Sequence, residues 1–243
     1  MSISSGCRIA VALALFLAPW PGAAAAAELV REDMRIAMPA AGPRGLQALL
    51  VRVDEPGRHP LVLINHGSPR ADSERPTMTP LELLPQAIEF ARRGFAAAIV
   101  MRRGYGDSGG GFAEDRGSCQ DPNYPRAAVA AAADLNAAIG FLARRPDIDA
   151  SRILSVGVSA GGFATVALTA EPPPGLVAGV SFAGGRGSDK PDSVCSEDKL
   201  VGAFGALGTR SRRCCGSMRR MIIFSDRRWR RDFATLSWAP AGK

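Results

Sequence analysis

Histidine is nearly absent from this chain of 243 residues, which contains only two, His59 and His66. Five cysteines are present, but none of their spacings resembles a zinc site, and two histidines are too few for most such sites. We therefore expect neither a bound metal nor a cofactor.

Long apolar runs are also missing, which argues against a membrane-spanning helix. The apolar run at 9–18 is too short to span a bilayer. It follows the positive charge of Arg8 and precedes a small-residue zone at 23–27, the pattern of a secretory signal peptide. We expect residues 1–27 to be removed, and the mature protein to be exported to the periplasm or secreted. No cysteine follows at a lipoprotein-like position, so no stable membrane anchor is expected.

Positive charge is concentrated in the last part of the chain. Residues 213–243 hold seven arginines, one lysine and two aspartates, a net charge of +6 out of +7 for the whole chain. No aromatic stacking platform or known binding motif accompanies this run, so a nucleic-acid partner is not expected. No internal repeat or linker divides the rest. We therefore assign 28–212 to a single core domain and 213–243 to an aberrant basic tail.

The core alternates apolar strands with helices. Continuously apolar strands are typical of parallel sheets that are covered on both faces, so the pattern predicts an α/β fold with a mostly parallel sheet and helices on both sides. The expected strands are 29–38, 46–53, 60–66, 95–101, 153–157 and 176–182, and the expected helices are 79–93, 124–144, 159–170 and 197–207.

The sequence Gly-Val-Ser-Ala-Gly at 157–161 is the most informative motif. It follows a short apolar strand and opens a helix of small residues, which is the layout of a nucleophile elbow. Gly157 and Gly161 are expected where strand and helix nearly touch. Ser159 is expected at the tip of the turn, and the helix N-terminus beside it offers free N–H groups to an oxyanion.

Three motifs in this order resemble the α/β-hydrolases, and especially their dienelactone hydrolase-like and prolyl-oligopeptidase-like branches. They are His66-Gly67 after the third strand, the Arg-Gly-Tyr-Gly-Asp-Ser-Gly run at 103–109 after the fourth, and the elbow after the fifth. The resemblance covers residues 29 to about 210. It implies an α/β-hydrolase fold whose C-terminal part is incomplete in this chain.

The resemblance also implies the chemistry of the site. Ser159 would attack an ester or a related carbonyl of a small molecule and form an acyl-enzyme. The backbone N–H groups of Ala160 and Ser68 would hold the oxyanion. His66 would support the loop that shapes this oxyanion hole. Tyr105 would either point into the cleft or pack within its loop.

Other polar residues near these motifs are less informative. Arg102 and Arg103 end a strand at the edge where ligands bind in such folds, so they would meet an acidic substrate or pair with a carboxylate such as Asp107. His59 lies in a turn and is expected to be solvated. Oligomeric state is left open.

A base and an acid are harder to place. In this fold the histidine follows the serine in sequence, and no histidine follows Ser159. Asp226 is a weak candidate for the acid, because arginines crowd the segment around it. We therefore expect impaired activity in this chain. A non-catalytic binding protein on the same fold remains an alternative. A prolyl-oligopeptidase-type peptidase is a further one, although no propeller domain precedes the core.

A frameshift near residues 210–213 would explain the tail. Shifted by one base, Cys214-Cys215 must encode leucine and Met221-Ile222 must encode aspartate. Permitted codons then give an apolar strand that ends in Asn-Asp, as the α/β-hydrolases have at their acid. The DNA of codons 205–243 and beyond tests this hypothesis, which fails if the restored frame encodes no downstream histidine.

Two cysteines of the core are expected to pair. Cys119 and Cys195 lie in loops that follow strands, and both loops are expected at the carboxyl edge of the sheet. Export permits a disulfide between them. Cys7 leaves with the signal peptide, and Cys214 and Cys215 lie in the tail.

Overall fold

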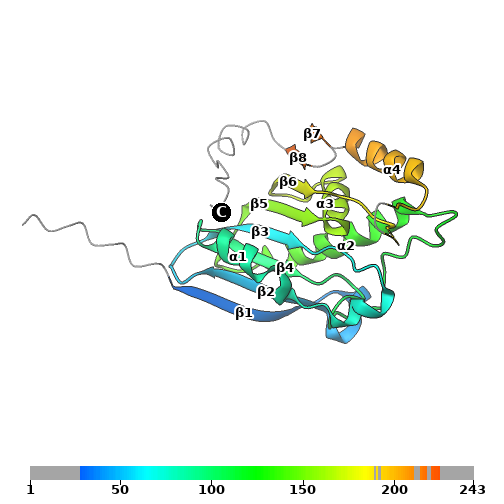
Figure 1. Cartoon of the computed structure of the whole chain (residues 1–243). Helices are drawn as coiled ribbons and strands as arrows, with labels where there is room; N and C mark the ends of the chain where they lie inside the picture. The colour runs from blue at the N-terminus through cyan, green and yellow to red at the C-terminus, as the bar shows by residue number, and fades with distance from the viewer. Residues whose placement is uncertain (1–27, 189, 191–192, 211–213, 218–219, 225–243) are drawn as a thin grey trace, which may run out of the picture.

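The structure, a computed structural model, describes residues 28–188, 190, 193–210, 214–217 and 220–224. The expected signal peptide and most of the basic tail lie outside these residues. In the described part, eight strands form one sheet in the order β1-β2-β4-β3-β5-β6-β8-β7 (Figure 1). The strands are β1 (Leu29–Ile36), β2 (Leu46–Val53), β3 (His59–Asn65), β4 (Ala96–Val100), β5 (Ile148–Val158), β6 (Leu176–Phe182), β7 (Cys214–Ser217) and β8 (Arg220–Phe224).

The sheet is mixed, with a parallel centre and antiparallel flanks. Strands β4, β3, β5 and β6 are parallel, whereas β1 and β2 form a hairpin that joins β4 in the antiparallel direction. The predicted parallel sheet is therefore found in the centre only. This arrangement places the carboxyl ends of β3, β4, β5 and β6 at one edge, where ligand sites form in open α/β sheets.

The C-terminal edge differs from the expectation. The sequence predicted regular structure only to residue 207, but the last helix extends to Arg210 and the backbone then forms β7 and β8. Strand β8 pairs with β6 in the antiparallel direction, and β7 pairs with β8. Backbone pairing with β6 requires only that N–H and C=O groups face each other, so it tolerates the unusual sequence of this segment.

Helices cover both faces of the sheet. α1 (Leu84–Ala91) packs against β2 and β4 on one face, while α2 (Tyr124–Leu142) and α3 (Ala160–Ala170) cover the other. α4 (Glu197–Arg210) packs on α3, beside the carboxyl edge. Within the residues that the structure describes, three short 3-10 helices occupy connections: Pro39–Arg44, Asp72–Thr77 and Pro80–Leu83.

The helix expected at 79–93 is divided into two parts. Thr79 caps its start in a capping box with Glu82. A continuous α-helix would need the N–H of residue 85 as a donor to Leu81, but Pro85 has no N–H. The N–H of Leu84 bonds to Leu81 instead, which makes the first turn a 3-10 turn, and α1 begins at Leu84.

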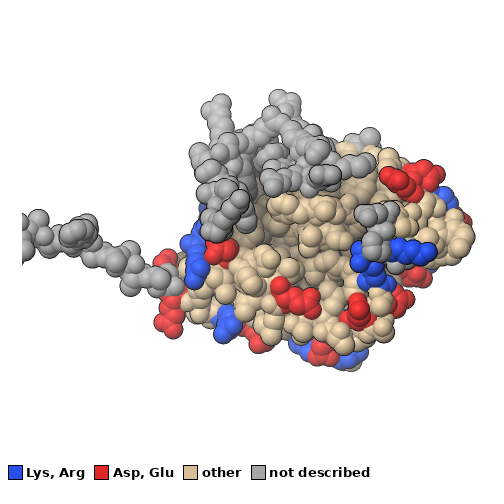
Figure 2. Space-filling model, in the orientation of Figure 1, with Lys and Arg blue, Asp and Glu red and all other residues tan. Residues whose placement is uncertain are grey.

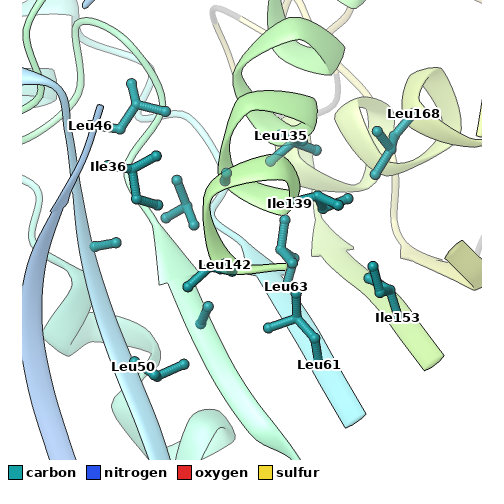
Figure 3. Packing of buried hydrophobic residues seen from close by; sticks show 14 of the residues in the cluster. Ile36, Leu46, Leu50, Leu61, Leu63, Leu135, Ile139, Leu142, Ile153 and Leu168 are labelled. Carbon is teal, nitrogen blue, oxygen red and sulfur yellow. The ribbon is translucent and has the colours of Figure 1, made fainter. Parts of the chain in front are cut away.

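The core is a pair of apolar layers, one on each side of the sheet. Figure 3 shows the layer between the sheet and α2, where Leu61 and Leu63 of β3 lie opposite Leu135, Ile139 and Leu142. All five side chains are buried. The second layer packs β2, β3 and β4 against α1. Alanines on β4 and α2 let these layers approach closely.

Charges of both signs are interspersed over the described residues on the face shown in Figure 2. Among the described residues, no helix is long and apolar enough to cross a membrane.

Two loops at the carboxyl edge are joined covalently. Cys119, in the loop before α2, forms a disulfide with Cys195, in the loop before α4, across 76 residues of sequence. The bridge ties these loops together at the side of the sheet where the elbow lies.

We expect the double variant Cys119→Ser/Cys195→Ser to lose about 2–4 kcal/mol of unfolding free energy, because a cross-link reduces the entropy of the unfolded chain. Urea unfolding of oxidised protein and of the variant measures the difference. Equal midpoints and slopes for the two proteins, or alkylation of Cys119 and Cys195 as free thiols in the oxidised protein, would contradict this expectation.

Candidate active site

Ser159 occupies a sharp turn between a strand and a helix. β5 ends at Val158 and α3 begins at Ala160, so Ser159 alone makes the turn. Its φ of 53° and ψ of −121° lie in a region that side-chain-bearing residues rarely adopt. The residue is solvent-exposed. The turn therefore holds the serine hydroxyl outward in a strained conformation, as a nucleophile requires.

Close backbone contacts impose this turn. A Cβ on Gly157 would lie 2.1 Å from the carbonyl oxygen of Gly161. A Cβ on Gly161 would lie 2.1 Å from the carbonyl oxygen of Asn65, at the end of β3. These distances are far below van der Waals contact, so both positions require glycine. They bring β3, β5 and α3 together directly beneath Ser159.

The loop after β3 lies against the serine. A Cβ on Gly67 would be 3.5 Å from the Cβ of Ser159. Ser68, Ser159 and Ala160 line one cavity of about 1080 Å³. The backbone N–H groups of Ser68 and Ala160 donate no hydrogen bond to another described residue. The structure thus brings together the serine and the two N–H groups that the sequence assigned to the oxyanion hole.

His66 supports this loop from beneath. It is buried, its Nδ1 lies 2.6 Å from the carbonyl oxygen of Gly67, and its Nε2 accepts from the backbone N–H of Arg102 at 3.2 Å. Since a neutral imidazole has one donor and one acceptor, Nδ1 carries the proton. Burial, with the nearby Arg102, lowers the pKa of His66 to about 3. His66 is therefore neutral and engaged in the loop, and it is not placed as a base for Ser159.

A buried ion-pair network lies under the same loop. Arg102 donates from both Nη atoms to the carbonyl oxygen of His66 at 3.1 and 3.0 Å, and its Nε pairs with Glu114. Arg186 pairs with the other carboxylate oxygen of Glu114 at 2.5 Å. Burial would raise the pKa of Glu114, but Arg102 and Arg186 more than offset this and lower it. Glu114 is therefore ionised, and it fixes the two arginines that surround it.

Tyr105 is packed and also reaches the loop. Its side chain is buried, its ring lies edge-on to His66, and its hydroxyl donates to Ser68 Oγ at 3.0 Å. Of the two placements that the sequence left open for Tyr105, the packed one is found. Tyr105 and Arg102 thus hold the 66–68 loop from two directions.

Arg102 and Arg103 both pair with carboxylates, which was one of the two expectations for them. The carboxylate named as an example, Asp107, was wrong, because it pairs with Arg35. Arg103 pairs with Asp134 of α2 at 2.6 Å. The turn at 104–107 carries Asp107 to the surface, away from the end of β4. Asp134 of α2 instead lies beside Arg103, at the end of that strand.

His59 is not solvated as expected. It is buried at the start of β3, with Nδ1 3.2 Å from the carbonyl oxygen of Gly94 and Nε2 3.3 Å from that of Glu55. The carbonyl groups of Gly94 and Glu55 surround the ring, and the local sequence gives no sign of these contacts. His59 lies at the opposite end of β3 from Gly67, so it is remote from Ser159.

The candidate acid Asp226 lies outside the described residues. In the described part of the chain, the side chain of Ser159 has no hydrogen-bond partner. Glu114 and Arg186 were missed by reasoning from the sequence, because they come from the irregular loops 111–123 and 183–196 and carry no motif. The cysteine pairing of these two loops was the only sequence signal for their proximity.

Fold and site together define an α/β-hydrolase. The family model described as X-Pro dipeptidyl-peptidase (S15 family) matches residues 32–209, so the chain belongs to that family. It is a hydrolase family. A search of curated proteins found no match.

Solved structures are similar in fold. A dienelactone hydrolase-like promiscuous phosphotriesterase from metagenomic libraries aligns with a TM-score of 0.51 and 18% identity, over 75% of this chain and 77% of its own. A candidate dienelactone hydrolase from Klebsiella pneumoniae aligns with a TM-score of 0.47 and 18% identity, over 69% of this chain. An α-amino acid ester hydrolase aligns with a TM-score of 0.43 and 17% identity, over 70% of this chain. The chain spans 65% of the length of the second and 28% of the third.

The buried state of His66 predicts a pH dependence of stability. Its folded pKa of about 3 lies below the ordinary value of 6.5, so the unfolded state binds more protons between these values. The contribution of His66 to the free energy of unfolding is therefore fully present above about pH 6.5. It falls by up to about 1.4 kcal/mol per pH unit as the pH drops toward 3. Urea titrations from pH 4 to 7 should show a steeper dependence for the native protein than for His66→Gln. Parallel curves would show that His66 is not buried in its neutral form.

Proposed function

We propose that this protein is a serine hydrolase that cleaves esters or small acyl compounds through an acyl-enzyme on Ser159. One observation carries the proposal: the exposed Ser159 stands in a strained elbow beside the two unbonded N–H groups of Ser68 and Ala160. Attack of Ser159 Oγ on the substrate carbonyl would form the acyl–oxygen bond and place negative charge on the carbonyl oxygen. Those N–H groups would stabilise this charge, and the alcohol would then leave with a proton.

The general base is the incomplete part of this mechanism. The two histidines of the sequence, His59 and His66, are both buried in contacts with backbone groups away from Ser159 Oγ. A serine hydroxyl is a weak nucleophile without a base. We therefore propose that this chain acylates slowly, and that its activity is limited by proton removal from Ser159 and not by oxyanion stabilisation.

Exogenous imidazole should replace the missing base. The rate of p-nitrophenyl butyrate hydrolysis is measured for the native chain and for Ser159→Ala, each with and without imidazole. The rate of Ser159→Ala, which includes hydrolysis by imidazole alone, is subtracted from that of the native chain. We expect this Ser159-dependent rate to rise by at least about tenfold when imidazole is added, because general base catalysis contributes about 10²–10⁴-fold in complete enzymes. A response of Ser159→Ala equal to that of the native chain would remove Ser159 from the mechanism.

Two other functions are tested by adding a second substrate and a binding measurement to this experiment. The family description favours a peptidase, so an X-Pro p-nitroanilide is tested beside the ester. Faster Ser159-dependent cleavage of the anilide would establish peptidase activity. The engaged histidines favour a binding protein on this fold, and substrate binding without any acylation of Ser159 would establish that function.

We also propose that the protein is exported after cleavage near residues 25–27. The disulfide between Cys119 and Cys195 supports this, because such bridges persist in oxidising compartments. The mass of the mature protein from exported material tests it; an intact residue 1–27 segment would contradict it.

A further inference from the structure

A closed triangle of hydrogen bonds lies beneath the elbow. Asn65, the last residue of β3, donates from Nδ2 to Ser155 Oγ of β5 and to Thr165 Oγ1 of α3, both at 2.8 Å. Ser155 Oγ lies 3.2 Å from Thr165 Oγ1, which closes the triangle. We call these three residues the polar triangle. It joins the three elements whose backbones meet under Ser159.

The polar triangle interrupts an apolar layer. Leu61 and Leu63 precede Asn65 on the same face of β3, because alternate residues of a strand share a face. Ile153 precedes Ser155 in the same way on β5. These apolar residues belong to the layer drawn in Figure 3. The side chains of the polar triangle are as fully buried as this layer, so apolar residues would fit the pattern at their positions.

One atom of the polar triangle has no partner. Asn65 Oδ1 is buried and accepts no hydrogen bond from any described residue. A buried acceptor without a donor lowers the stability of a folded protein. An apolar side chain would avoid this loss, so stability alone does not account for an amide at this position. The two hydrogen bonds from Nδ2 must therefore supply something that apolar packing does not.

Hydrogen bonds constrain α3 more than apolar contacts do. Apolar attraction has no direction, so a helix that lies on an apolar surface can slide or turn with little change in buried area. A hydrogen bond requires a defined distance and angle. Thr165 is held on two sides, because its Oγ1 accepts from Asn65 and its Cγ2 would lie 3.0 Å from a Cβ on Gly179 of β6. α3 is thus fixed at Thr165 in rotation and along its axis.

The position of α3 sets the geometry of the oxyanion hole. Ala160 is the first residue of α3 and precedes Thr165 by a rise of about 7.5 Å along the helix axis. Ser68 follows Asn65 closely, on the loop that leaves β3. A shift of α3 against β3 would therefore change the distance between the two oxyanion N–H groups. Oxyanion donors must lie within hydrogen-bond distance of the developing charge, so a small shift of either donor slows the reaction.

We propose that Asn65 is a positioning residue for the oxyanion hole, and that it acts through Thr165 and Ser155. Its amide touches no substrate in this role. It holds α3 against β3, and so keeps the N–H groups of Ala160 and Ser68 at the separation that one oxyanion requires. This inference rests on the proposed function and deepens it, because it assigns part of the oxyanion geometry to a buried side chain outside the cavity.

Hydrogen exchange of single amides, measured by NMR on the full chain, tests the inference without any need for catalysis. The N–H of Phe163 donates to the carbonyl oxygen of Ser159 at 3.0 Å, so its exchange reports on the first turn of α3. Thr165→Val loses the hydroxyl at nearly the same side-chain size. We expect this variant to exchange at Phe163 at least about tenfold faster than the native chain, which corresponds to about 1.4 kcal/mol. Exchange at Ala143, which follows α2, should not change.

Two matched variants control this measurement. Thr169→Val makes the same change one turn further along α3, where the hydroxyl donates to the carbonyl oxygen of Val166 at 2.8 Å and is not part of the polar triangle. It should exchange at Phe163 like the native chain. Thr165→Ser keeps the hydroxyl and should also retain the native rate.

Equal exchange at Phe163 in folded Thr165→Val and in the native chain overturns the inference. An equal rise at Phe163 and Ala143 would indicate a general loss of stability, and it overturns the inference too. If Thr165→Val does not fold, as circular dichroism would show, Ser155→Ala replaces it, because it removes another member of the polar triangle. The same two outcomes then apply to that variant.

A labelling rate separates this inference from the proposed function. With imidazole present, a fluorophosphonate should label Ser159 at least about tenfold more slowly in Thr165→Val than in Thr169→Val, since loss of one oxyanion donor slows enzymes about 10²–10³-fold. The expected change in exchange, without labelling of Ser159 in the native chain, supports the hold of the polar triangle on α3 and refutes the hydrolase. Equal labelling of Ser159 in the two variants supports the hydrolase and refutes the positioning role.

Discussion

The contact between β3, β5 and α3 beneath Ser159 is the constraint on which the site depends. Gly157, Gly161 and the carbonyl of Asn65 meet there with no room for a Cβ. The chain must therefore turn within one residue, and the only residue available is Ser159. The same contact aims the first N–H of α3 at the cavity. The strain in Ser159 is maintained by the packed strands on either side, because relaxing it would separate the helix from the sheet.

The second half of the site depends on buried electrostatics. Arg102 holds the 66–68 loop through two hydrogen bonds to His66, and Glu114 holds Arg102. Removing one member of such a buried pair leaves an uncompensated charge, which is strongly destabilising. Glu114 also holds Arg186, which lines the cavity. The 66–68 loop and the loop that carries Arg186 are thus anchored by a single carboxylate.

Much of the fold could be predicted from the sequence, because apolar strands, caps and the elbow are local patterns. Strands β3, β4 and β6 and helices α2 and α3 lie close to their expected ranges, whereas β5 begins five residues before its expected start. Ser159, Ala160 and Ser68 line one cavity. The contacts of Glu114 and Arg186 could not be predicted, since they join loops far apart in sequence. Burial of His59 was missed for the same reason. The antiparallel β8 was missed because its composition argues against a core strand, and the frameshift hypothesis stays a prediction.

The most direct test of the account is covalent labelling of the chain with a fluorophosphonate, followed by peptide mass spectrometry. The reagent reacts with a nucleophilic serine that has oxyanion donors beside it, and a missing base slows this reaction. The account predicts one slow adduct, on Ser159, that forms faster with imidazole and is absent in Ser159→Ala. An adduct on another residue, or no adduct while the folded state is intact, would contradict it.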